Sequence, residues 1–285
     1  RSEPLPEVLV GTELGRRAVV YDRARLQDQG SLDDLERVLP NVEAVSLVVA
    51  WFGTDLRAGA CQVRPGIEDP AKVTSPLTWS VNGVLRAAAH PVSLEEGRPV
   101  YGGTPSDASV VEAIRELRAR GKRITFYPFL MMDIPAGNTL PNPYSAGAAT
   151  PGQPALPWRG RITCAPAAGF AGSVDRTAVA AAQVAAFFGA ATLGSFAVTG
   201  TSVRWTGPGG DWGYRRMILH YARLCAAAGG VESFLIGSEL RGLTTIRSGA
   251  DSYPAVEALR ALAADCRTIL GPATKIGYAA DWSEW

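Results

Sequence analysis

Five apolar runs rich in β-branched or aromatic residues alternate along the chain with segments whose apolar residues recur at helical spacing. Short continuous apolar runs are typical of strands buried on both faces, as in a parallel sheet. We therefore predict strands at Ala44–Phe52, Val100–Gly103, Arg123–Asp133, Ser233–Glu239 and Lys275–Asp281.

The clearest unit is a strand, a helix and a strand between Val100 and Met132. Its helix begins near Thr104–Asp107, where a capping residue, a proline and an acidic residue stand together, and it ends at Gly121. The links are very short, which predicts parallel strands joined by a right-handed crossover. Further helices are predicted at residues 173–187, 211–228 and 254–270.

This alternation predicts an α/β fold, a (β/α)8 TIM-barrel-like domain of which the chain supplies about the first five units. An open doubly wound sheet is the alternative, because five units do not close a barrel. We expect a connecting segment at residues 1–41 and the N-terminal part of the barrel at 42–285. Two insertions are expected: a hairpin excursion at about 57–99 and a long Pro/Gly loop at about 134–170.

Composition restricts the classes of function. The chain is 47% hydrophobic and 19% charged with a formal net charge of +1, which is ordinary for a globular domain. It has no run of Lys and Arg, so we expect no nucleic-acid contact. No apolar stretch reaches the length that spans a bilayer, and the first residues lack the apolar region of a signal peptide. The missing initial Met and the abrupt end suggest a segment cut from a longer protein.

Four acidic residues make the strand ends chemically interesting. Asp133, Glu239 and Asp281 end the third, fourth and fifth predicted strands, and Glu284 follows three residues later. Carboxylates that converge on one face are what glycoside hydrolysis requires. Glu239 is the candidate general acid/base, and the other three are the remaining catalytic candidates. The simpler alternative is that such residues cap the following helix or pair with arginine.

Aromatic residues are frequent near the same strand ends. We predict that Glu239 lies in a cleft to which Trp51, Tyr127, Ser238, Trp205 and Trp282 contribute, because flat apolar rings can stack on sugar faces. The alternative is that the tryptophans plug the space under long loops. Arg159 and Arg161, beside Trp158, are suited to hold a carboxylate ligand, although exposed arginines are usually only solvated.

Other signals are weak. His90 and His220 are isolated in the sequence, so we predict neither a catalytic triad nor a metal site, and no cofactor. Cys61, Cys164, Cys225 and Cys266 match no zinc spacing. Buried free thiols are favoured, and a disulfide remains an alternative.

Six segments together resemble a known family. They are Tyr101–Asp107, Thr125–Pro135, Pro157–Cys164, Arg216–Ala222, Phe234–Leu243 and Ile276–Glu284. They resemble the TIM-barrel-like, glycoside-hydrolase-like domain of the tail baseplate (hub) protein of gene transfer agents, which is related to phage tail host-specificity proteins. The resemblance covers roughly Val42 to Trp285.

The resemblance implies a component of the tail tip of a phage-like particle, assembled in the bacterial cytoplasm and released. Its implied partners are other tail and baseplate proteins, with a cell-envelope glycan as ligand and an oligomer, a trimer, formed through the rest of the protein. The wider glycosidase clan places an acid/base Glu at the end of the fourth strand, usually after Asn, and a nucleophile Glu at the end of the seventh. Glu239 matches the first position, whereas Ser238 replaces the Asn.

Three functions follow as hypotheses. The first is a structural tail-tip protein whose glycosidase-derived barrel binds envelope glycans. The second is an active glycoside hydrolase that degrades peptidoglycan or surface polysaccharide with Glu239 as general acid/base. The third is a free-standing bacterial glycosidase that belongs to no particle. We favour the first.

Overall fold

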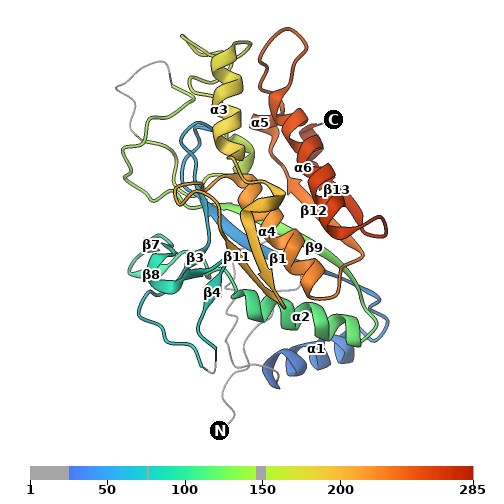
Figure 1. The fold of residues 1–285 in the computed structure, drawn as a ribbon. Coiled ribbons are helices and arrows are strands. Elements are labelled where there is room, and N and C mark those ends of the chain that lie inside the picture. Colours follow the sequence, from blue (N-terminus) through green and yellow to red (C-terminus); the bar gives the residue numbers. More distant parts are fainter. Residues whose placement is uncertain (1–25, 76, 146–151, 285) are drawn as a thin grey trace.

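The computed structural model describes residues 26–75, 77–145 and 152–284. Its centre is a five-stranded sheet in the order β13-β12-β9-β1-β2 (Figure 1). The strands are β1 (Ala44–Gly53), β2 (Val63–Arg64), β9 (Arg123–Met132), β12 (Ser233–Ser238) and β13 (Lys275–Ala279). Strand β2 is antiparallel to β1, and the other four strands are parallel to one another.

Strands β1 and β9 form the longest pairing, which runs in register from Ala44 opposite Arg123 to Gly53 opposite Met132. Because the four strands are parallel, their carboxyl ends meet at one edge of the sheet, which we call the carboxyl edge. Asp133 and Glu239 directly follow β9 and β12, and Asp281 follows β13 after one residue. The prediction that these three acidic residues share one rim is confirmed.

The predicted strand at Val100–Gly103 is wrong. This segment pairs with no strand of the sheet, and β9 lies directly beside β1. A side chain holds the segment instead: the Thr104 hydroxyl donates to the Ala50 carbonyl at 2.7 Å and accepts from the Gly66 amide at 2.9 Å. Glu239 therefore follows the third parallel strand counted from β1 among the described residues, and not the fourth.

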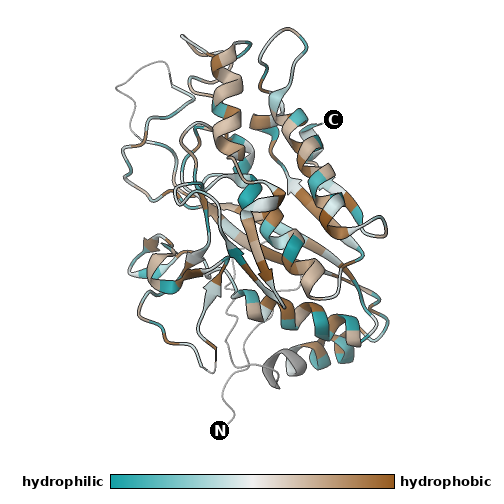
Figure 2. Ribbon diagram, in the orientation of Figure 1, coloured by the Kyte–Doolittle hydropathy of each residue, from teal (hydrophilic) through white to brown (hydrophobic). Residues whose placement is uncertain are grey.

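Helices α2 (Asp107–Ala119), α4 (Tyr214–Ala227) and α6 (Pro254–Leu270) form one layer against one face of the sheet, and α3 (Ala178–Phe188) packs against α4 and α6 (Figure 1). Buried residues alternate along β9, and its Phe126 ring lies 5.3 Å from Tyr221 of α4 and 5.9 Å from Phe234 of β12. Figure 2 shows hydrophobic colour along much of β1 and β9. On the opposite face, Tyr127 and Phe129 are only half-buried.

This winding favours a barrel-like sheet over the doubly wound alternative. The parallel strands follow each other in chain order, and the helices between them lie in one layer, whereas a doubly wound sheet reverses strand order and carries helices on both faces. Within the described residues the sheet ends at β2 and β13 and does not close. The expectation of five β/α units is reduced to four parallel strands.

The excursion predicted at about 57–99 is present. After β2 it contains β3 (Gly66–Ile67), β4 (Ser80–Val81), β5 (Val84–Leu85), η1 (Arg86–Ala88), β6 (His90–Pro91), β7 (Leu94–Glu95) and β8 (Arg98–Pro99). These strands pair only locally, in antiparallel β4-β5 and β7-β8 hairpins and a parallel β3-β6 pair.

Both histidines fasten this excursion to the sheet and its helices, which corrects the view that they stand alone. His220 on α4 is fully buried, with Nε2 at 2.8 Å from Asp107 and Nδ1 at 3.1 Å from the Asn82 amide. His90 on β6 places Nε2 at 2.6 Å from Asp133. The two contacts hold the excursion at separate points, one beside α4 and one at the carboxyl edge.

The stretch Ala178–Ser195 has the length and the apolar composition that could cross a membrane, and 28% of it is buried inside the protein. Its helix α3 has 11 residues and ends at Gly189, whose φ is 74°. A helix of that length spans only about 16 Å, roughly half the apolar thickness of a bilayer. In this structure α3 packs against α4 and α6. It begins after its N-cap Thr177, later than predicted.

The remaining elements are α1 (Leu26–Val38), η2 (Arg159–Arg161), η3 (Leu193–Ser195), the hairpin β10 (Phe196–Thr199) and β11 (Ser202–Trp205), α5 (Arg241–Thr244) and η4 (Trp282–Glu284). Helix α1 lies in the segment predicted to be a connector. Its Leu32 is buried, and Glu36 pairs with Lys122 at 2.7 Å. This part of the segment therefore packs on the domain, and residues 1–25 lie outside the described residues.

Candidate functional site

Glu239 is the centre of a small cluster at the carboxyl edge. Its carboxylate accepts a hydrogen bond from Trp158 Nε1 at 2.8 Å and pairs with Arg159 Nη2 at 2.7 Å. Its side chain is 27% exposed. Glu239 has a φ of 51°, a left-handed conformation that is uncommon for a residue with a side chain and is concentrated at functional sites.

Arg159 determines the position of this carboxylate. Arg159 is nearly buried, and its Nε donates to the carbonyl of Ser238 at 3.1 Å and lies 3.2 Å from the Ser238 hydroxyl. Its guanidinium group lies 3.8 Å from the centre of the Phe129 ring. The guanidinium is therefore fixed on three sides and holds the Glu239 carboxylate in place through a charge-assisted contact. Ser238 is buried and faces Arg159, so in this structure its hydroxyl group contacts the guanidinium of Arg159.

The long Pro/Gly loop carries Trp158 and Arg159 to Glu239. Its residue Thr163 exchanges hydrogen bonds with the chain after β1: the Thr163 amide donates to Leu56 at 2.9 Å, and the Ala58 amide donates to Thr163 at 2.8 Å. On the other side it packs against α5. A Cβ on Gly242 would lie 2.4 Å from the Ile162 carbonyl, so this close approach requires glycine.

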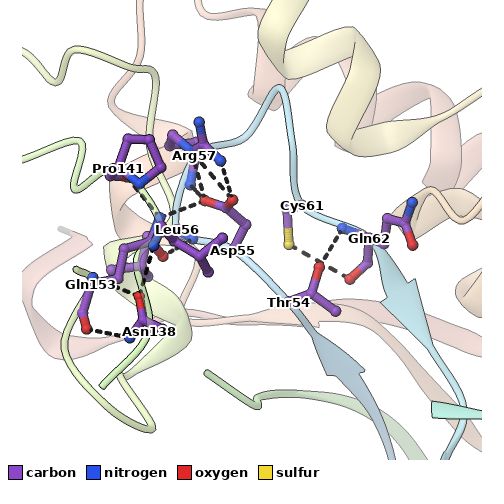
Figure 3. Close-up of polar contacts among 10 residues, drawn as sticks. Thr54, Asp55, Leu56, Arg57, Cys61, Gln62, Asn138, Pro141 and Gln153 are labelled. Carbon is purple, nitrogen blue, oxygen red and sulfur yellow. Dashed lines mark hydrogen bonds and ion pairs between the residues drawn. The ribbon is translucent and has the colours of Figure 1, made fainter. Parts of the chain in front are cut away.

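A second network, drawn in Figure 3, holds the earlier part of this loop. Asp55 is buried; it accepts from Gln153 Nε2 at 2.6 Å and pairs with Arg57 at 2.6 Å. Gln153 also accepts from the Leu56 amide at 2.7 Å, and Asn138 donates to its carbonyl at 2.7 Å. Asp55 was not among the residues predicted from the sequence. Its carboxylate binds Gln153 and Arg57 and thereby holds the loop in place.

Asp133 is not available as a catalytic group. Its side chain is fully buried and accepts from His90 Nε2 at 2.6 Å and from the Ser93 amide at 3.0 Å. Burial, followed by the charge of Asp133, raises the pKa of the neighbouring Tyr101 to about 12. Asp133 therefore anchors the excursion. This local structural role is of the kind that the simpler alternative for acidic residues at strand ends describes.

Asp281 and Glu284 are also occupied locally. Asp281 accepts from the Ser283 amide at 3.0 Å and from its hydroxyl, and the Ser283 hydroxyl is the main cause of the lowered pKa of Asp281. Glu284 accepts from the Tyr278 hydroxyl at 2.9 Å and from Thr244 at 3.0 Å. These contacts fix the turn after β13.

The predicted aromatic residues lie in different parts of the domain. Trp51 is fully buried among the helices, where its Nε1 donates to Tyr221 at 2.8 Å. Trp205 lies on the β10-β11 hairpin, where the centre of its ring is 4.4 Å from the guanidinium of Arg216 on α4. Tyr127 is half-buried, and its ring lies 5.3 Å from that of Phe129, the ring on which Arg159 stacks.

Trp282 is 84% exposed at the carboxyl edge, and Trp158 is 38% exposed. Sequence reasoning placed Trp158 in the long loop but did not connect it with Glu239. The available signal was Pro157-Trp158-Arg159-Gly160, an aromatic and a cationic residue beside glycine in a long loop.

Among the described residues no group of three or more His, Cys, Asp or Glu is arranged to hold a metal ion. The cysteines are all buried and free, so the predicted free thiols are confirmed and the disulfide alternative is wrong.

The last part of the chain contains the family signal. Residues 212–285 match the GTA TIM-barrel-like domain. The matched region includes α4, β12 with Glu239, α6 and β13. It supports a gene transfer agent TIM-barrel-like domain here, together with the parallel sheet. The resemblance at Tyr101–Asp107, Thr125–Pro135 and Pro157–Cys164 lies outside the match. Comparison with curated proteins found no match.

Proposed function

We propose that this chain is a structural component of a gene transfer agent particle and that its GTA TIM-barrel-like domain binds cell-envelope glycan at the carboxyl edge. The proposal places it in the tail tip or baseplate, with other tail proteins as partners and a trimer formed through the rest of the protein. The family match at residues 212–285 supports the assignment to a gene transfer agent particle. The cluster around Glu239 supports the binding of a glycan.

The proposed glycan binding rests on one observation, the contact between Trp158 and Glu239. The indole N–H is fixed on the carboxylate at 2.8 Å while the ring stays 38% exposed. A fixed aromatic face beside a hydrogen-bond acceptor matches a sugar ring, which has an apolar C–H face and hydroxyl donors at its rim. The ring loses little conformational freedom on binding, because its position is already set.

Binding is favoured over turnover for two reasons. The Glu239 carboxylate is engaged by Arg159 at 2.7 Å and by Trp158 at 2.8 Å, whereas a general acid must be free to reach the glycosidic oxygen. Retaining and inverting hydrolysis both require a second carboxylate near the first. Asp133, Asp281 and Glu284 are each engaged in local hydrogen bonds.

Glycoside hydrolysis with Glu239 as general acid/base is the second candidate. The left-handed φ of 51° at Glu239 favours it, because strained backbone is retained where a side chain must be aimed. Binding of substrate would have to displace Arg159 from Glu239 so that the carboxyl group can reach the glycosidic oxygen. A free-standing glycosidase outside any particle is the third hypothesis, and the gene transfer agent match disfavours it.

Titration of peptidoglycan and capsular fragments against the protein, followed by tryptophan fluorescence, tests the proposal. We expect dissociation constants of about 0.1–1 mM, as a few stacked rings and hydrogen bonds provide. Trp158→Ala and Glu239→Gln should each weaken binding about tenfold. Glu257→Gln makes the same chemical change at an exposed position on α6 and should bind as the parent does.

Release of reducing ends is measured in the same samples. Rapid release that Glu239→Gln abolishes would establish the hydrolase instead. Absence of binding to every envelope fragment would leave the domain an architectural one. The particle assignment is tested separately, by labelling purified particles with an antibody against this chain; label away from the tail tip contradicts it.

A further inference from the structure

The Glu239 carboxylate uses its two oxygens unequally. Trp158 Nε1 at 2.8 Å and Arg159 Nη2 at 2.7 Å both contact the same oxygen, Oε2. Within the part of the chain that the structure describes, no protein donor contacts the other oxygen, Oε1. The side-chain nitrogen and oxygen atoms that are enclosed there without a partner are Nε of Arg64 and Nε of Arg223, so Oε1 is not enclosed. It is an acceptor that faces solvent.

The carboxylate is also the more exposed member of its ion pair. The Glu239 side chain is 27% exposed, whereas the Arg159 side chain is 9% exposed. One face of the guanidinium lies on the Phe129 ring at 3.8 Å, and its Nε donates to the Ser238 carbonyl at 3.1 Å. A ligand that approaches this cluster from solvent therefore meets the carboxylate, while the guanidinium is largely enclosed.

A carboxylate oxygen accepts hydrogen bonds and donates none. The ligand group that faces Oε1 must therefore be a donor, and hydroxyl, amide and ammonium groups meet this condition. A uronic acid or a phosphorylated sugar carries an anionic group of its own, which like-charge repulsion disfavours beside Glu239. Arg159 offsets this repulsion only in part, because its Nη2 is already paired with Glu239.

We infer that Glu239 selects the glycan by its charge: the site takes neutral or amino-bearing sugars, which donate to Oε1, and rejects acidic sugars. This inference rests on the proposed glycan binding and specifies the class of glycan. The indole ring of Trp158 stacks on the apolar face of either class. The discrimination therefore comes from Glu239.

Tetrasaccharides that share one backbone and differ in charge test the inference. The neutral probe is the N-acetylglucosamine tetramer, the amino-bearing probe is the glucosamine tetramer, and the acidic probe is the N-acetylglucosamine tetramer with its primary hydroxyls oxidised to carboxyl groups. Any neutral envelope fragment that binds in the fluorescence titration is compared with its own oxidised form in the same way. We expect the parent protein to bind the neutral and amino-bearing forms about tenfold more tightly than the acidic form.

Glu239→Gln should remove this preference. The amide carries no charge, presents a donor as well as an acceptor, and releases Arg159 from the ion pair. Binding of the neutral form should therefore weaken, while binding of the acidic form stays equal or tightens. Glu257→Gln removes one negative charge at an exposed position on α6 and should keep the preference. Circular dichroism melts show whether each variant is folded, and the ranking of the probes by the parent protein tests the inference without any variant.

The failures are distinguishable. If the acidic forms bind the parent protein as tightly as the neutral forms or more tightly, the inference is wrong and the proposed glycan site stands. The same conclusion follows if Glu239→Gln keeps the full preference, or if Glu257→Gln loses it as well, because the charge of Glu239 then does not set the preference. If no tetramer and no envelope fragment binds, the inference and the proposed function are both wrong.

Discussion

Arg159 Nη2 lies 2.7 Å from the Glu239 carboxylate, and the same guanidinium lies 3.8 Å from the centre of the Phe129 ring. Three separate parts of the chain meet in this contact: a strand, a long loop and the end of another strand. The pair is nearly buried on the arginine side, so its loss has consequences for both stability and the shape of the site.

Arg159→Met should lower the free energy of unfolding by about 1–3 kcal/mol, because Ser238 and Glu239 lose a charged donor and Phe129 loses its stacking partner. Arg161→Met is the control, since Arg161 is exposed in the same loop and stacks only on Tyr144. Urea unfolding of both variants measures the difference. Equal stability of the two would show that the ion pair contributes little.

Asp55→Asn should loosen the long loop. The Asp55 carboxylate accepts from both Arg57 and Gln153, and an amide in its place would direct N–H groups at these donors. We expect limited proteolysis to cleave within residues 134–170 at least several times faster than in the parent. Asp34→Asn, at an exposed pair on α1, is the control. Unchanged cleavage would mean that other contacts hold the loop.

His220→Ala should free the tip of the excursion. The substitution removes the His220 partner of Asp107 Oδ1 and of Asn82 Nδ2, while Asn82 keeps its bonds to Asp107 and Arg216, and it costs about 1–3 kcal/mol in addition to the lost packing. Hydrogen exchange should rise in residues 80–85 and stay unchanged in residues 90–93, which His90 holds to Asp133. Equal protection of the tip in variant and parent contradicts this role.

Asp175→Asn should reduce the loss of stability in acid. Burial disfavours ionisation of Asp175, but hydrogen bonds from the Arg247 amide and guanidinium outweigh it and lower the pKa below the ordinary 3.8. The pair therefore stabilises the fold fully above pH of about 4 and is lost as the pH falls through the lowered folded-state pKa. Unfolding free energies from pH 2 to 7 should show a shallower acid slope in the variant.

The cysteines should be unreactive in the native protein. Burial raises the pKa of Cys61 and of Cys266 to about 12, and the thiolate is the reactive form. An aromatic disulfide reagent at pH 8 should modify Cys61, Cys164, Cys225 and Cys266 only after denaturation. Rapid labelling of any of them without denaturant would indicate local opening.

The sequence determined the elements whose signals are local. The apolar run of β9 alternates between two faces, and α2 has its cap at Ser106, whose hydroxyl accepts from the Ser109 amide at 3.2 Å. Because parallel strands must end at one edge, the shared rim of Asp133, Glu239 and Asp281 also followed from strand order alone. These features depend on residues that are close in the sequence or on the spacing at which apolar residues recur along the chain.

Only the tertiary structure decided which side chains meet. Val100–Gly103 has the composition of a strand, but Thr104 bonds to Ala50 and leaves the position beside β1 to β9. Trp51 ends a strand, yet its face of the sheet packs on Tyr221. Glu239 was visible as a carboxylate, whereas its partner Arg159 comes from a long loop whose path no local pattern specifies. Pairings between distant segments depend on the packed geometry of the whole domain, because each residue has many partners of similar chemistry available until the chain is folded.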